Sequence, residues 1–208
     1  MSESFSEFRE QCWECRRSRK SCLCSKIKPF KSQPLIVLLV HPRESRNSVG
    51  TARIAHLCLS NSILIQGDGF GFDQNPKIRA LVEDPRNLPF VLYPGEKAED
   101  LSTFDKNPGD PHQRFVIFVI DGTWSTAKRM IRRSEILMNL PQIRFQPTSA
   151  STYRIRKEPA FECVSTVEAV HTLLREFEGP RVQHENLLQV FDAMVDFQLQ
   201  FNDPSVHI

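Results

Sequence analysis

The segment 115–124 reads FVIFVIDGTW, an uninterrupted apolar run that ends in an acidic residue and a turn. Such a run, bounded on both sides by turn-forming residues, predicts a buried β-strand over 115–120. The residues that follow, 124–140, predict an amphipathic helix. Its apolar face carries Trp124, Ala127, Ile131 and Met138, and its basic side chains lie largely elsewhere. A buried strand that leads directly into an amphipathic helix is typical of α/β proteins.

The rest of the chain repeats this alternation. Further strands are expected at 35–40, 62–66, 89–93 and 143–145, and further helices at 49–59, 77–82, 165–178 and 182–201. The pattern predicts an α/β domain with a mostly parallel sheet that is covered by helices on both faces. Polar residues and prolines around 28–33 predict a boundary between a small N-terminal module, 1–32, and a main domain, 33–208.

Four of the six cysteines lie in the first 24 residues, as Cys12, Cys15, Cys22 and Cys24. Four thiolates are a typical ligand set for a tetrahedral structural Zn²⁺ ion. The alternative is a pair of disulfides in a secreted protein. Because residues 1–11 are polar and acidic, without the apolar core of a signal peptide, we expect an intracellular, cytoplasmic protein whose thiols are free to bind zinc.

Composition narrows the class of protein. With 208 residues and 40% hydrophobic content, the chain can bury a substantial core. Its longest apolar run, 34–40, is far shorter than the roughly 20 residues that cross a bilayer, so no membrane partner is expected. The net charge is only +2, but the basic residues cluster at 16–20, 26–31, 128–133 and 154–157. Clusters of this kind favour a polyanion such as nucleic acid, although solvated surface is the alternative for each of them.

Two other features have a structural and a functional interpretation. Gly67, Gly69 and Gly71 lack the spacing of a dinucleotide fingerprint and the lysine of a phosphate-binding loop, so we expect a flexible loop there. His41 follows the first strand, at the edge where open α/β sheets bind ligands. A histidine at the end of a strand is also a common structural residue.

Asp121 ends the strand at 115–120 and therefore faces the ligand-binding edge of the predicted sheet. The apolar strand before it reduces its hydration, which suits a general base. Asp121 could equally cap the helix that follows, since aspartate and threonine accept hydrogen bonds from free amides at helix starts. The sequence leaves these two roles open.

The motifs of this chain resemble those of the DTW-domain proteins, which include the tRNA-uridine aminocarboxypropyltransferases. The segment 121–130, DGTWSTAKRM, resembles the family signature, and the cysteine pattern resembles its N-terminal zinc motif. Three further segments resemble the first-strand, middle and late motifs of the family. They are 41–44, 92–98 and the stretch from 153–159 to 165–169.

The resemblance implies a SPOUT-like fold, with a trefoil knot in the C-terminal half. It also implies transfer of the 3-amino-3-carboxypropyl group from S-adenosylmethionine to N3 of a tRNA uridine, with release of methylthioadenosine. Asp121 would be the base or an orienting group. The cofactor would contact Leu92, Pro94, Gly95, Thr123, Trp124, Val164, Ser165 and Thr166. The RNA phosphates would contact Arg43, Arg154, Arg156 and Lys157, together with Arg16, Arg17, Arg19 and Lys20 of the cysteine segment.

Alternatives remain for individual residues and for the whole protein. Trp124 could be a core anchor for its helix instead of a cofactor contact. Ser165 and Glu168 have the spacing of a helix capping box. An RNA methyltransferase on the same scaffold and a non-catalytic, zinc-containing RNA-binding protein are the competing functions. The sequence does not indicate an oligomeric state.

Overall fold

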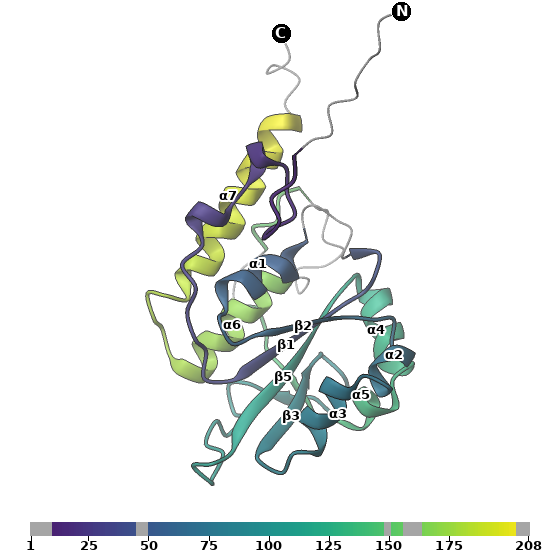
Figure 1. Ribbon diagram of the computed structural model, residues 1–208. Coiled ribbons are helices and arrows are strands. Elements are labelled where there is room, and N and C mark those ends of the chain that lie inside the picture. Colours follow the sequence, from purple (N-terminus) through teal and green to yellow (C-terminus); the bar gives the residue numbers. More distant parts are fainter. Residues whose placement is uncertain (1–9, 45–49, 148–150, 156–163, 203–208) are drawn as a thin grey trace, which may run out of the picture.

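The computed structural model describes residues 10–44, 50–147, 151–155 and 164–202 (Figure 1). Its centre is a six-stranded sheet in the order β2-β1-β5-β3-β6-β4, in which every pair is parallel. The strands are β1 (Leu35–Val40), β2 (Ile63–Gln66), β3 (Asn87–Leu92), β4 (Glu99–Asp100), β5 (Arg114–Asp121) and β6 (Gln142–Arg144). The predicted parallel α/β sheet is confirmed, and β4 is an addition.

Helices cover both faces of the sheet (Figure 1). One face carries α1 (Thr51–Cys58), α6 (Thr166–Glu178) and α7 (Glu185–Asn202), and the other carries α2 (Phe70–Asp73), α3 (Pro76–Glu83), α4 (Trp124–Arg132) and α5 (Glu135–Asn139). Successive side chains of β1 alternate between the two cores. Ile36 and Leu38 pack toward α1 and α6, whereas Val37 and Leu39 pack toward the other face. A strand buried on both faces explains the continuous apolar run.

The single helix predicted over 124–140 is wrong, because the chain breaks between α4 and α5 at Ser134. The buried Ser134 caps α5, accepting a hydrogen bond from the amide of Leu137 at 3.2 Å. Asp73 of α2 accepts from the Ser134 hydroxyl at 2.6 Å and from the amides of Glu135 and Ile136 at 2.9 and 3.1 Å. These acceptors satisfy the free amides of a new helix, so the chain starts one there.

The glycine-rich segment 67–71 is a loop only in its first half, because α2 begins at Phe70. Gly69 has a φ of +116°, which favours glycine. A Cβ atom at Gly69 would lie 2.5 Å from Cβ of Arg133 and 2.8 Å from the carbonyl oxygen of Met130. The glycine therefore allows the segment to pack closely on the end of α4.

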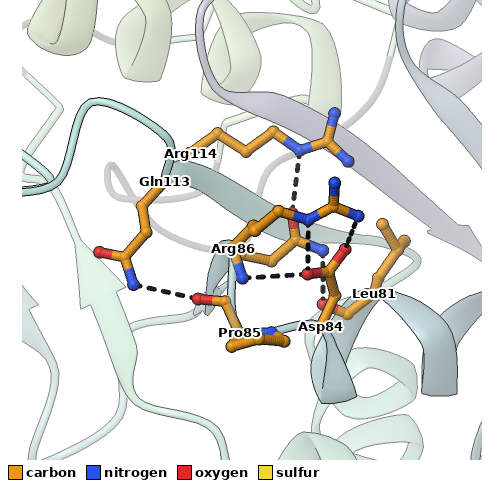
Figure 2. Close-up of polar contacts among 7 residues, drawn as sticks. Leu81, Asp84, Pro85, Arg86, Gln113 and Arg114 are labelled. Atoms are coloured by element: carbon orange, nitrogen blue, oxygen red, sulfur yellow. Dashed lines mark hydrogen bonds and ion pairs between the residues drawn. The ribbon is translucent and has the colours of Figure 1, made fainter.

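A polar network joins the amino-terminal ends of β3 and β5 (Figure 2). The buried Asn87 accepts a hydrogen bond from Nε of Arg114 at 2.9 Å and donates one to the carbonyl oxygen of Leu81 at 2.9 Å. Beside it, Arg86 binds both carboxylate oxygens of Asp84 at 3.0 and 2.8 Å and lowers the pKa of that carboxyl to about 2. This edge of the sheet is held by structural contacts.

The N-terminal segment lies along α7 and packs directly on the main domain (Figure 1). Leu23 and Phe30 belong to the same core as α1, α6 and α7. Asn186 of α7 accepts a hydrogen bond from the amide of Lys28 at 2.8 Å and donates one to the carbonyl oxygen of Lys26 at 3.0 Å. The boundary at 32/33 and the trefoil knot stay predictions. Among the described residues, no helix is long and apolar enough to cross a membrane.

Candidate active site and metal centre

A cavity of about 400 Å³ opens at the carboxyl-terminal ends of β3, β5 and β6. Open parallel α/β sheets bind their ligands at this edge. Most of the predicted cofactor residues line the cavity, namely Leu92, Pro94, Trp124, Val164 and Thr166. The other three are their chain neighbours, and two of these, Thr123 and Ser165, cap α4 and α6. The structure therefore brings together three predicted segments that are far apart in the sequence.

The segment 144–147 forms a wall of the cavity that the sequence did not reveal as part of the site. Arg144 ends β6, and Phe145, Gln146 and Pro147 follow it. The available signal was the predicted strand at 143–145, since the residues after a parallel strand reach the ligand-binding edge. Arg144 is exposed and brings a guanidinium to a lining that is otherwise largely apolar.

Trp124 lines the cavity and is 42% exposed. Its ring centroid is 6.2 Å from that of Tyr93, with the two rings tilted by 51°. A core anchor would be buried, so the alternative interpretation of Trp124 as a core anchor of its helix is wrong. The two rings instead offer flat apolar surfaces beside the cavity.

Asp121 is 7% exposed, and the residues on either side of it, Ile120 and Gly122, line the cavity. Its carboxylate oxygen Oδ1 accepts hydrogen bonds from the hydroxyls of Thr166 at 2.5 Å and Thr51 at 3.3 Å. It does not cap α4. That role belongs to Thr123, whose hydroxyl accepts from the amide of Thr126 at 3.2 Å. Asp121 thus ties the starts of α1 and α6 to the end of β5.

Ser165 and Glu168 form the capping box that their spacing predicted. Ser165 Oγ accepts from the amide of Glu168 at 3.3 Å, and Glu168 Oε2 accepts from the amide of Ser165 at 2.7 Å. The same carboxylate accepts from the hydroxyl of Ser151 at 2.8 Å and the amide of Thr152 at 2.7 Å. Glu168 therefore holds the segment 151–155 against α6, which is a structural role.

The residues predicted to contact RNA differ in their surroundings. Arg43 is exposed, and its amide donates to Nδ1 of His41 at 3.2 Å, which gives His41 a structural contact. Arg154 forms an ion pair with Asp196 of α7 at 2.5 Å, so its charge is already partnered. Arg156 and Lys157 lie outside the described residues.

A second cavity, of about 520 Å³, lies next to the first, and Tyr93 lines both. It runs between α4 and the segment that follows β3. Three exposed cations line it, Lys97, Lys128 and Arg132, together with the exposed carboxylates of Glu96 and Glu99. Part of the basic run at 128–133 therefore faces a hollow surface beside the site.

The four N-terminal cysteines form one cluster, in which all four sulfur atoms lie within 4.8 Å of one another. Cys12 Sγ lies 3.6 Å from Cys24 Sγ, and Cys15 Sγ lies 3.8 Å from Cys22 Sγ. A disulfide requires about 2.05 Å. Tetrahedral zinc with bonds of about 2.3 Å places its sulfurs about 3.8 Å apart. The cluster fits zinc, and the disulfide alternative is wrong for these cysteines.

The thiols of the cluster titrate differently. Hydrogen bonds from the backbone at Cys15 and Glu14 lower the pKa of Cys12 to about 6, whereas burial raises the pKa of Cys24. Of these two candidate ligands, Cys12 is the one that more readily supplies a thiolate.

Arg17 does not fit its predicted role as a phosphate contact, because only 3% of it is exposed. Its neighbours Arg16, Arg19 and Lys20 are exposed, as predicted for a basic surface. Burial lowers the pKa of Arg17, while the nearby Cys15, Tyr153 and Cys22 act in the opposite direction. The Arg17 side chain of this basic run therefore points into the protein interior, next to the cysteine segment.

Comparison with known proteins connects this geometry to a family. The DTW domain matches residues 9–199. The tRNA-uridine aminocarboxypropyltransferase 2 of Mus musculus is 29% identical over 198 residues, which cover 93% of this chain and 65% of that protein. The protein of the same name from Drosophila melanogaster is 28% identical, over 92% of this chain and 76% of that protein. The tRNA-uridine aminocarboxypropyltransferase A of Arabidopsis thaliana is 27% identical, over 94% of this chain and 83% of that protein.

The chain thus spans just under two thirds of the mouse relative's length, and no solved structure gives a significant match. The domain match, in contrast, covers nearly the whole chain and includes the cysteine cluster, Asp121 and the cavity wall. On this evidence the chain belongs to the DTW domain family.

Proposed function

We propose that this protein transfers the 3-amino-3-carboxypropyl group of S-adenosylmethionine to N3 of a uridine in tRNA and releases methylthioadenosine. The observation that carries the proposal is the cavity at the carboxyl-terminal edge of the sheet, lined by the segments that resemble the family motifs. Relatives named tRNA-uridine aminocarboxypropyltransferase, which align with more than nine tenths of this chain, support the reaction class.

The reaction needs positioning more than it needs a reactive side chain. The sulfonium of S-adenosylmethionine makes each attached carbon electrophilic, so the orientation of the donor decides which carbon reacts. Uridine N3 gives its proton to solvent water and attacks the γ-carbon of the methionine part. The carbon–sulfur bond breaks, and its electron pair stays on sulfur as the neutral thioether of methylthioadenosine.

We assign the orientation of the donor to two features of the cavity wall. The apolar residues Leu92, Pro94 and Trp124 suit the adenosine part of the donor. The guanidinium of Arg144 suits the carboxylate of the group that is transferred, because arginine binds carboxylates with two parallel hydrogen bonds. Together they would turn the γ-carbon toward the acceptor.

Asp121 acts, in this proposal, through Thr166. Thr166 lines the cavity and donates to the Asp121 carboxylate, so the carboxylate fixes where the threonine oxygen points. That oxygen is left to accept a hydrogen bond from the ligand. The alternative role, direct removal of the N3 proton by Asp121, requires the carboxylate to reach the acceptor itself.

The RNA is proposed to enter from the second cavity. Lys97, Lys128 and Arg132 offer phosphate contacts there, and Tyr93 leads from that surface to the donor site. Arg43, Arg156 and Lys157 remain predicted RNA contacts. Zinc bound by Cys12, Cys15, Cys22 and Cys24 is proposed as a structural ion of the N-terminal segment. A cytoplasmic location stays a prediction.

The test is product analysis with an unmodified tRNA transcript and S-adenosylmethionine that is isotopically labelled in its aminocarboxypropyl chain. After digestion to nucleosides, the expected result is labelled uridine carrying that group, together with unlabelled methylthioadenosine. A methyl group on the RNA with adenosylhomocysteine would instead indicate a methyltransferase. RNA binding without any product would favour the non-catalytic alternative.

A further inference from the structure

Arg17 is buried without a described partner. It lies in the loop between the candidate ligands Cys15 and Cys22, and only 3% of it is exposed. Its Nη1 and Nη2 atoms form no hydrogen bond with any residue that the structure describes. Burial of an unpaired guanidinium is strongly unfavourable, so a partner beyond the described residues is needed.

The sulfur cluster can provide that partner once it holds a metal. Four thiolates around one Zn²⁺ ion form a complex with a double negative charge, whereas four protonated thiols carry none. Cys15 and Cys22 both lie close enough to Arg17 to favour its charge. Arg17 follows Cys15 by two residues, so its buried side chain belongs to the loop that the Cys15 and Cys22 sulfurs close at 3.8 Å.

A second cation approaches the cluster from the main domain. Arg53 of α1 is half-buried; burial and the neighbouring charge of Arg16 lower its pKa, and Cys15 acts in the opposite direction. Tyr153 is buried beside Arg17 and packs against Phe191 of α7, with ring centroids 5.2 Å apart.

We propose that Arg17 and Arg53 are the counter-cations of a doubly negative zinc tetrathiolate centre. On this account, zinc binding turns the buried Arg17 guanidinium from an unpaired charge into a hydrogen-bond donor to thiolate sulfur. The same charges hold the metal cluster against α1. Metal loading then fastens the N-terminal segment to the main domain at its cysteine end, in addition to the contacts of Asn186.

The first test is zinc affinity, measured by competition with a chromophoric chelator at fixed pH. Arg17→Met keeps most of the apolar stem and removes the charge, and we expect it to weaken zinc binding by roughly 10- to 100-fold, as is typical for loss of an outer-shell partner. Arg17→Lys should recover most of that loss. The matched control is Arg19→Met, in the same loop but exposed and paired with Glu10, which should leave the affinity unchanged.

The second test separates a charge role from a packing role. In the zinc-loaded protein, Arg17→Met should lower the unfolding temperature relative to wild type. In the chelated protein it should leave that temperature unchanged or raise it, because it removes an unpaired buried charge. A residue that only packs would lower both temperatures, and that result would overturn the proposal.

Arg53→Gln keeps the proposal testable if Arg17→Met fails to fold, because Arg53 lies outside the ligand loop. It should weaken zinc binding by a smaller factor than Arg17→Met. Wild-type zinc affinity in both Arg17→Met and Arg53→Gln would overturn the proposal. A wild-type protein that takes up no zinc would overturn the metal assignment as well, whether or not the protein transfers a group to tRNA.

Discussion

The cavity at the sheet edge and the cysteine cluster are two ligand sites built in different ways. The cavity is made of segments far apart in the sequence, and the chain's own hydrogen bonds hold them, such as Thr166 to Asp121 and Ser165 to Glu168. The cluster comes from one short segment, its sulfurs are not joined, and the buried Arg17 beside it is unpaired among the described residues. Among the described residues, the first candidate site is held by the chain's own contacts, whereas the second is proposed to be completed by an ion.

The largest expected effect concerns the cluster. Cys15→Ser removes one of four thiolates, so the protein should lose stoichiometric zinc while its α/β domain stays folded. Elemental analysis together with circular dichroism checks this. The matched control is Cys58→Ser, because Cys58 is buried in α1 and its pKa is raised to about 12 by that burial. Zinc retained by Cys15→Ser would remove that residue from the ligand set.

The next effect concerns the cavity and should leave zinc content untouched. Asp121→Ala should lower kcat by roughly 10²-fold, because Thr166 and the ligand that it contacts lose their fixed position. Asp121→Asn keeps an oxygen that accepts from Thr166 and should therefore retain much more activity. Steady-state kinetics of the two variants separate the roles. If Asp121→Asn is as inactive as Asp121→Ala, Asp121 removes the N3 proton of the uridine itself, and the positioning role is wrong.

A smaller effect is expected at the surface beside the cavity. Replacing both Lys128 and Arg132 with alanine should weaken tRNA binding and flatten its dependence on salt by roughly two phosphate contacts. Arg154→Ala should change binding less, because Arg154 already pairs with Asp196. Filter binding over a salt series measures both. A larger loss of tRNA affinity in Arg154→Ala would instead place the RNA at the surface around Arg154, as the sequence predicted.

The smallest effect lies away from both sites. Asp73→Ala removes the acceptor for Ser134, Glu135 and Ile136 and should cost about 1 kcal/mol of unfolding free energy. Burial raises the pKa of Asp73, but these hydrogen bonds outweigh it and lower the pKa overall. The Asp73 carboxylate therefore contributes to the free energy of unfolding at pH values above its pKa in the unfolded chain. This contribution is lost as the pH falls through its pKa in the folded protein. Urea unfolding of the wild type and of Asp73→Ala should show a smaller difference in unfolding free energy at acidic pH than at neutral pH.

The sequence predicted what depends on local spacing. The four cysteines, the parallel sheet and the capping box of α6 all follow from residues close together in the chain. It missed what depends on distant partners. The break at Ser134 requires Asp73, which is 61 residues away, and the wall at 144–147 requires β6 to pair between β3 and β4. Arg17 was misassigned because a run of basic residues does not indicate which one turns inward.

Calorimetric titration of S-adenosylmethionine tests the difference between the two sites most directly. The zinc-loaded and the chelated protein should each bind one molecule per chain with similar affinity, because the cavity is held by the chain's own contacts. Ala169→Phe, which fills the cavity from α6, should abolish binding in both forms. Binding that disappears with the zinc, or that survives in Ala169→Phe, would contradict the account.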